Sequence, residues 1–197
     1  MSARILSALA VLSLATVLSL AMPSPAAAHD VPADVTVQAF LKPEGSRLHL
    51  LVRAPLAALR DIEYPARGPG YLDLPRVDAS LRHAASLWIA DPIELYEDDA
   101  RLPPPRIVAA RVSLPSDRSF GSYEEAVAHL TGAPLPEETE LYWSQGMLDV
   151  WLDYPIRSDQ SRLLIHPGLA RLGLEVTTVL RFLPPGGAVR AFEFSGD

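Results

Sequence analysis

Apolar and polar residues alternate along most of this chain, which is the pattern of β-strands that bury one face. The clearest alternation runs through residues 147–153, where Leu148, Val150 and Leu152 fall on the same side of the predicted strand. These three side chains are therefore predicted to lie in the core. Shorter strand candidates occur at residues 93–96 and 106–114.

Two hairpins are predicted where paired strand-like segments are joined by a turn signal. The first turn contains Gly45, and the second is the run Pro184–Gly187, which favours a tight reversal of the chain. The paired segments are residues 35–41 with 48–52 and residues 172–182 with 188–194.

Helical patterns are short. Ser122 followed by Glu125 forms a capping box that predicts a helix ending near Gly132, and Asp78–Ala85 is a second candidate. The 19 prolines are concentrated in the connections and disfavour long helices. The predicted fold class is therefore mainly β, an antiparallel β-sandwich with one or two short helical insertions.

The first 28 residues are typical of a secretory signal peptide. Arg4 precedes an uncharged run from Ile5 to Met22, and Ala26–Ala28 provides a small-residue cleavage site. We expect cleavage before His29, which leaves residues 29–197 as one extracytoplasmic domain. An uncleaved membrane anchor is the alternative, because the run has the minimum length of a membrane span. The predicted location is the periplasm or the extracytoplasmic face of the inner membrane.

Composition narrows the classes of partner. The 197 residues carry a formal net charge of −7, which argues against nucleic acid as a ligand, since phosphate binding needs a basic surface. The chain has no cysteine, so thiolate metal sites and cysteine nucleophiles are excluded. After residue 28 no apolar run is long enough to span a bilayer, so the mature chain is expected to have no transmembrane helix.

Metal binding is a possibility at one position. His29 becomes the new N-terminus after cleavage, where its amine and its imidazole together offer a two-point chelate to nickel, cobalt or copper. The other histidines are expected to be surface or strand-edge residues, because none forms a recognised metal-binding spacing. These are His49, His83, His129 and His166.

The remaining polar and aromatic clusters favour structural roles. The acidic stretch Glu94–Asp99 is interpreted as a solvated hairpin turn, because it lacks the spacing of a calcium loop. Asp149 and Asp153 flank Trp151, but their Cα atoms would lie about 13 Å apart on one strand, too far for a concerted carboxylate pair. Aromatic residues are assigned to core packing rather than to a carbohydrate or peptide platform: Trp88, Tyr142, Trp143, Trp151 and Tyr154.

No nucleophile elbow, phosphate loop or dinucleotide fingerprint occurs, so a non-catalytic role is expected.

A series of short stretches resembles one known family along the whole chain after the signal peptide. The stretches are His29–Pro32, Val35–Val37, Phe40–Pro43, Leu50–Arg53, Gly68–Asp73, Leu87–Asp91, Leu95–Glu97, Ala110–Arg118, Glu140–Trp143, Arg181–Gly187 and Phe192–Phe194. Together they resemble the extracytoplasmic N-terminal region of HupE/UreJ-like membrane proteins.

The resemblance implies an accessory role in nickel or cobalt uptake, through interaction or metal presentation, with a membrane domain or membrane protein as partner. In that family a multi-helix membrane domain follows, whereas this chain ends at Asp197, so none of the family's intramembrane residues is expected here. A truncated product, a fragment and a free-standing domain all remain open. The alternative function is an independent periplasmic metal-binding β-sandwich, like a copper-handling protein.

Overall fold

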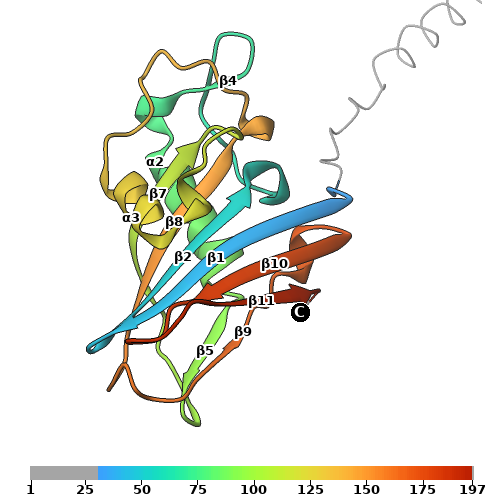
Figure 1. The fold of residues 1–197 in the computed structure, drawn as a ribbon. Helices are drawn as coiled ribbons and strands as arrows, with labels where there is room; N and C mark the ends of the chain where they lie inside the picture. The colour runs from blue at the N-terminus through green and yellow to red at the C-terminus, as the bar shows by residue number, and fades with distance from the viewer. Residues whose placement is uncertain (1–30, 197) are drawn as a thin grey trace, which may run out of the picture. The chain divides into compact units, whose positions relative to one another are not determined.

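A six-stranded sheet forms the centre of the computed structural model, which describes residues 31–196 (Figure 1). Its strand order is β11-β10-β1-β2-β8-β7, so β11 and β7 are the two edges. The strands are β1 (Asp34–Glu44), β2 (Arg47–Pro55), β7 (Arg106–Ser113), β8 (Met147–Pro155), β10 (Glu175–Phe182) and β11 (Arg190–Ser195).

Both predicted hairpins are confirmed. β1 pairs with β2 and β10 pairs with β11, each in antiparallel register. In the second turn Gly186 has a φ of +67°, a conformation that favours glycine.

One pairing departs from the expected antiparallel arrangement, because β1 and β10 run parallel, which makes the sheet mixed. Parallel neighbours need a long crossover connection, and the chain between β2 and β10 provides it.

The inner face of this sheet is the core of the domain. Leu148, Val150 and Leu152 are all fully buried there, as the alternation predicts. A three-stranded sheet of order β6-β5-β9 lies over this face, and its Leu95 belongs to the same apolar cluster. The smaller sheets consist of β5 (Glu94–Glu97), β6 (Ala100–Arg101) and β9 (Leu163–His166), and of the pair β3 (Ala66–Arg67) and β4 (Tyr71–Leu72).

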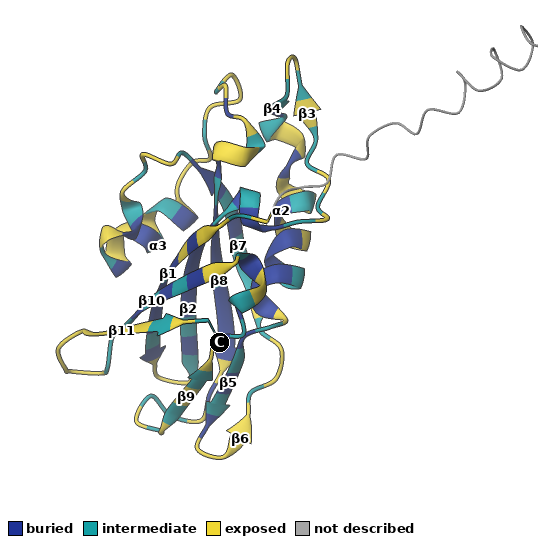
Figure 2. Ribbon diagram, turned by 90° about the vertical axis from the view of Figure 1, so that its right-hand side faces the viewer, coloured by how far each residue is buried: buried dark blue, intermediate teal, exposed yellow. Residues whose placement is uncertain are grey.

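The outer face of the large sheet is partly covered by a helix. α3 (Tyr123–Thr131) begins where predicted, with the Ser122 hydroxyl accepting a hydrogen bond from the Glu125 amide at 3.2 Å. Its Tyr123 and Leu130 pack with Leu51 in a second, smaller apolar cluster. The central strands of the sheet are thus buried on both faces (Figure 2).

The other helical segments are short. The second predicted helix is confirmed as α2 (Asp78–Ala84), which continues into a wider turn, η3 (Ala85–Ala90), that the sequence pattern does not reveal. The single-turn segments are η1 (Leu56–Ala58), η2 (Leu74–Arg76), η4 (Ser119–Gly121), η5 (Trp143–Gln145) and η6 (Ala170–Leu172).

The predicted fold class, mainly β and sandwich-like with short helices, is confirmed. Among residues 31–196, no helix is both long enough and apolar enough to cross a lipid bilayer. The predicted signal peptide (residues 1–28), its cleavage site and His29 lie outside the described residues.

Candidate functional site

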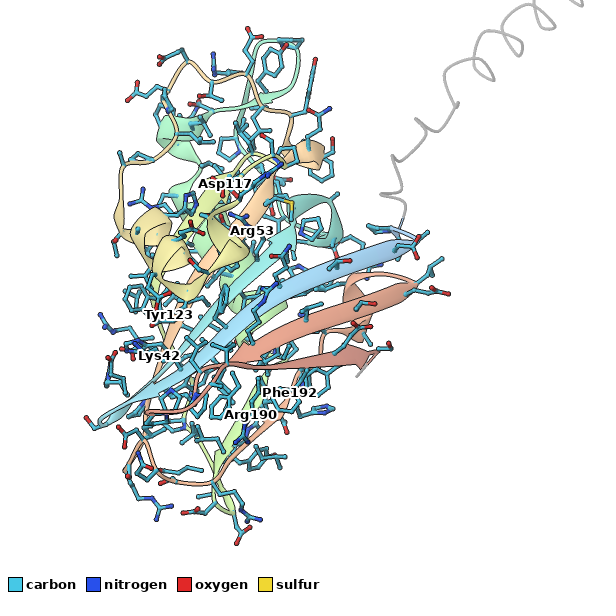
Figure 3. All side chains as sticks on the ribbon, in the orientation of Figure 1. Lys42, Arg53, Asp117, Tyr123, Arg190 and Phe192 are labelled. Atoms are coloured by element: carbon cyan, nitrogen blue, oxygen red, sulfur yellow. The ribbon has the colours of Figure 1, made fainter. Side chains whose placement is uncertain are left out.

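A buried ionic network lies between the outer face of the sheet and α3. Arg53 on β2 is directly opposite Asp149 on β8 and donates two hydrogen bonds to its carboxylate, at 2.6 and 2.7 Å. Arg53 also donates to Asp117 Oδ1 at 2.9 Å. On α3, His129 Nε2 lies 2.9 Å from Asp149 Oδ2. Figure 3 labels Arg53 and Asp117 beside the helix.

This network fastens α3 to the sheet. Asp149 is fully buried and Arg53 is 4% exposed, so neither presents its charge to a substrate in solvent. A serine nucleophile would need a hydrogen bond to a histidine base, whereas the Ser119 hydroxyl donates to Asp117 at 2.5 Å. Burial opposes ionisation of Asp117, but bonds from Ser119 and Arg53 outweigh it and lower the pKa of Asp117 to about 2.

A second ionic cluster surrounds Asp153 at the other end of β8. Arg47 and Arg106 both donate to its carboxylate. Burial raises the pKa of Asp153, but these two guanidinium groups reverse the effect and leave it below its ordinary value. Asp149 and Asp153 are therefore bound by different arginines.

The histidines divide into two groups. His83 and His166 are exposed, as predicted. The prediction is wrong for His49 and His129, which are each only 17% exposed. His49 lies on β2 beneath α3, and His129 points from α3 towards Asp149 on the sheet. His49 Nδ1 lies 3.0 Å from the Tyr123 hydroxyl, and burial lowers the pKa of its imidazole.

Within residues 31–196, no group of three or more His, Asp or Glu side chains is arranged to hold a metal ion. The proposed role of His29 therefore stays a prediction, because that residue lies outside the described part of the chain.

The acidic stretch is only partly a solvated turn. Asp98 and Asp99 are exposed between β5 and β6, as predicted. Glu97 is 3% exposed, contrary to the prediction, and accepts hydrogen bonds from the amide and the guanidinium of Arg157. Burial disfavours its charged form, but bonds from Ser161 and Arg157 outweigh this and lower the pKa of Glu97 to about 2.

Core packing is confirmed for Trp88 and Tyr154, at 6% and 2% exposure. Trp143 and Trp151 are partly buried. The assignment is wrong for Tyr142, which is 38% exposed and rests on the ring of Tyr71, with 4.6 Å between the ring centroids.

An apolar groove of about 500 Å³ lies between β9 and the β10–β11 hairpin. Its lining includes Phe192 and Phe194 from β11, Phe182 from β10, and Leu164 and Ile165 from β9. Phe192 is 45% exposed and Leu164 is 60% exposed, so the groove is lined in part by large apolar residues that remain in contact with solvent. In Figure 3 the labelled Phe192 and Arg190 lie on the β9 side of β11.

The groove has a distinct electrostatic character. Arg162 and Arg190 line it, and none of the described lining residues is acidic, although the whole chain carries a net charge of −7. Arg162 is paired with Asp99 at 2.6 Å, whereas no ion-pair partner of Arg190 is found among residues 31–196. An exposed apolar groove with a positive rim can bind a partner that offers apolar groups next to negative charge.

Sequence reasoning missed this groove because it joins residues 161–165 to residues 180–194. The local pattern predicts a strand at residues 188–194 but none at residues 161–165, so it could not show that the two segments lie together. The one signal available was the alternation of Phe192 and Phe194 in the last strand of the pattern.

No protein-family model matches the chain, and no curated protein matches it significantly.

Proposed function

We propose that this chain is a non-catalytic interaction domain on the extracytoplasmic side of a membrane, acting as an accessory part of a HupE/UreJ-type nickel or cobalt uptake system. The groove between β9 and β11 is the docking face for the membrane partner in this proposal. The observation that supports it is the solvent exposure of Phe192 and Leu164, which both line the groove, with no acidic residue in the described lining.

Energetics favour a docking role for this surface. Exposed apolar groups cost free energy in water, and covering them contributes about 25 cal/mol for each Å² removed from solvent. Aromatic residues, phenylalanine among them, and arginine are also enriched at protein interfaces relative to the rest of the surface. Phe192 and Arg190 provide this combination at the groove.

Site-specific photo-crosslinking in cells tests the proposal. A benzophenone analogue of phenylalanine replaces Phe192 in one strain and Tyr142 in another. Tyr142 is a matched control, because it is aromatic, is 38% exposed and lies near β4, at the end of the domain away from β9 (Figures 1 and 2). We expect the first position to capture a multi-helix membrane protein and the second not to capture it.

A functional readout accompanies this experiment. Phe192→Asp should weaken association with the captured protein by about tenfold or more, because it places a charge where an apolar side chain docks. Accumulation of nickel or cobalt should fall with it, whereas Tyr142→Asp should leave both unchanged. Equal adducts from the two crosslinking positions, or none from Phe192, would contradict the proposal.

A further inference from the structure

The outer edge of β11 carries backbone groups that no strand in the described structure uses. β11 is the edge of the six-stranded sheet. The Gly196 amide donates to the Val176 carbonyl at 2.9 Å, and this contact continues the β10–β11 register. In an antiparallel pair, hydrogen bonds to the neighbouring strand recur at every second residue. Counting back from Gly196, the residues bonded to β10 are Phe194 and Phe192, so their backbone groups point towards β10. Ala191, Glu193 and Ser195 therefore point theirs away from the sheet.

The side chains of β11 alternate between the two faces of the sheet. Phe192 and Phe194 are paired with Leu180 and Thr178 on β10, and their rings line the groove. A residue placed opposite Phe192 or Phe194 on an added strand would direct its side chain to the same side, since directly opposed residues share a face. Every second residue of such a strand would thus contact the groove.

The charge of Arg190 determines which residue is favoured at a third position of the added strand, the position opposite Arg190. Arg190 is on the same face as Phe192, two residues earlier, and also lines the groove. Its guanidinium has no ion-pair partner among the described residues, so a carboxylate opposite it would find an available cation. A lysine or arginine at that position would instead be repelled.

We propose that the groove binds its partner by β-strand addition, in which an extended segment of the partner pairs antiparallel with β11. The segment carries two apolar residues at alternate positions, opposite Phe194 and Phe192, followed by an acidic residue opposite Arg190. This inference rests on the proposed function, since it specifies how the same groove holds the partner. Backbone hydrogen bonds supply part of the affinity, and the alternate side chains supply specificity.

The free backbone groups favour a peptide over a lipid surface as the occupant. A lipid tail covers apolar rings but provides no donors and acceptors for Ala191, Glu193 and Ser195. An extended segment satisfies both requirements at once, because its backbone lies along the edge while its side chains enter the groove.

A proline at the edge separates strand addition from apolar docking alone. Glu193→Pro removes an amide that faces away from β10, so the β10–β11 ladder is retained, and edge strands accept proline at such positions. Glu193→Gln is the matched control that removes the charge and keeps the amide. Each variant is combined with the benzophenone analogue at Leu164 on β9. We expect the crosslink to the partner protein to be lost in Glu193→Pro and kept in Glu193→Gln. Thermal unfolding of both variants confirms that they fold.

A synthetic probe measures the interaction directly. In acetyl-Thr-Val-Thr-Val-Thr-Asp-Thr-amide, the valines would lie opposite Phe194 and Phe192, and the aspartate would lie opposite Arg190. Saturable chemical-shift changes at the amides of Ala191, Glu193 and Ser195 are expected. Methylating the backbone amides of the threonines at peptide positions 3 and 5, which face β11, should weaken binding by about tenfold or more through loss of hydrogen bonds. Methylating the valine amides, which face away, should leave binding unchanged.

Exchanging the aspartate for lysine should weaken binding roughly threefold, the size expected for an exposed ion pair, and Arg190→Glu should reverse this preference.

The outcomes distinguish the two proposals. If Glu193→Pro keeps the adduct and the probe does not bind at millimolar concentration, strand addition is wrong while the interaction role stands. If neither Phe192 nor Leu164 captures a protein, both proposals fail. If the chain binds phosphatidylglycerol vesicles and Glu193→Pro binds them equally, the groove contacts lipid and strand addition is likewise overturned.

Discussion

The two edge strands of the six-stranded sheet differ in how far the rest of the chain covers them. At one edge, α2 and α3 both pack on β7, and Ala110 and Val112 are buried. Arg111 of β7 donates to the Gly132 carbonyl at the end of α3 at 3.1 Å. The β7–β8 register also shifts between Ile107 and Ala109, an irregularity that disrupts an edge as a template for pairing.

At the other edge, every residue of β11 except the partly buried Phe194 is exposed. Exposed edges invite pairing with other chains, so proteins usually protect them. The described residues protect β7 with helices and an irregular register, while β11 has only Arg190 and Glu193 as charged residues. The contrast shows that β7 is packed into the domain while β11 remains an accessible edge, the edge that the proposed strand addition uses.

The largest expected difference in stability is between the same substitution, valine to aspartate, made at two positions. Val150 is fully buried on β8 and Val189 is 57% exposed just before β11. Val150→Asp should cost about 5 kcal/mol or more, because it buries an unpaired carboxylate, and this approaches the whole stability of an ordinary domain. Val189→Asp should change stability by less than about 0.5 kcal/mol. Urea denaturation measures both, and a parent-like midpoint for Val150→Asp would show that the core face is assigned incorrectly.

Two arginines give the next contrast. Arg53→Met removes the main partner of the fully buried Asp149 and should destabilise the domain by about 3–5 kcal/mol, the usual cost of an uncompensated buried charge. Arg190→Met, on the exposed edge, should alter stability by less than about 0.5 kcal/mol. Equal unfolding midpoints for the two variants would mean that the network under α3 contributes nothing to holding the helix.

Acid should weaken the scaffold through carboxylates whose pKa is low in the folded state. The pKa values of Glu97 and Asp117 are about 2, below their ordinary values near 4. Their contribution to stability is fully present above those ordinary values and is lost as the pH falls towards 2. Glu97→Gln should therefore reduce the slope of unfolding free energy between about pH 4.5 and 2.

Glu193→Gln provides the control for this pH series, because the same change is made on the exposed edge strand. We expect it to keep the parent slope. A loss of slope in Glu193→Gln, or an unchanged slope in Glu97→Gln, would show that the pH dependence originates elsewhere.

The smallest effect lies within β11 itself and involves no change in stability. The amides of Phe192 and Phe194 face β10 and should be protected from hydrogen exchange, while those of Ala191 and Glu193 face solvent and should exchange freely. Residue-resolved exchange followed by NMR measures the pattern. Protection of Ala191 and Glu193 would show that the free edge is already occupied, and its disappearance on dilution would indicate self-pairing.

Much of the local structure followed from the sequence. The alternation in residues 147–153 identified the buried face of β8, and the Ser122–Glu125 spacing identified the start of α3. The Pro184–Gly187 turn located the β10–β11 hairpin. Each of these features depends on neighbours a few residues apart, so the pattern contains the necessary information.

Three features were decided only by the tertiary structure: the parallel pairing of β1 with β10, the burial of Asp149 and the existence of the groove. The alternation at β8 assigned its second face to the outside, but α3 covers that face and turns Asp149 into a buried partner of Arg53. The groove needs β9 and β11 to lie on facing sheets. A period of two specifies which side chains share a face, but not which distant segment covers that face or leaves it open, because long-range packing determines this.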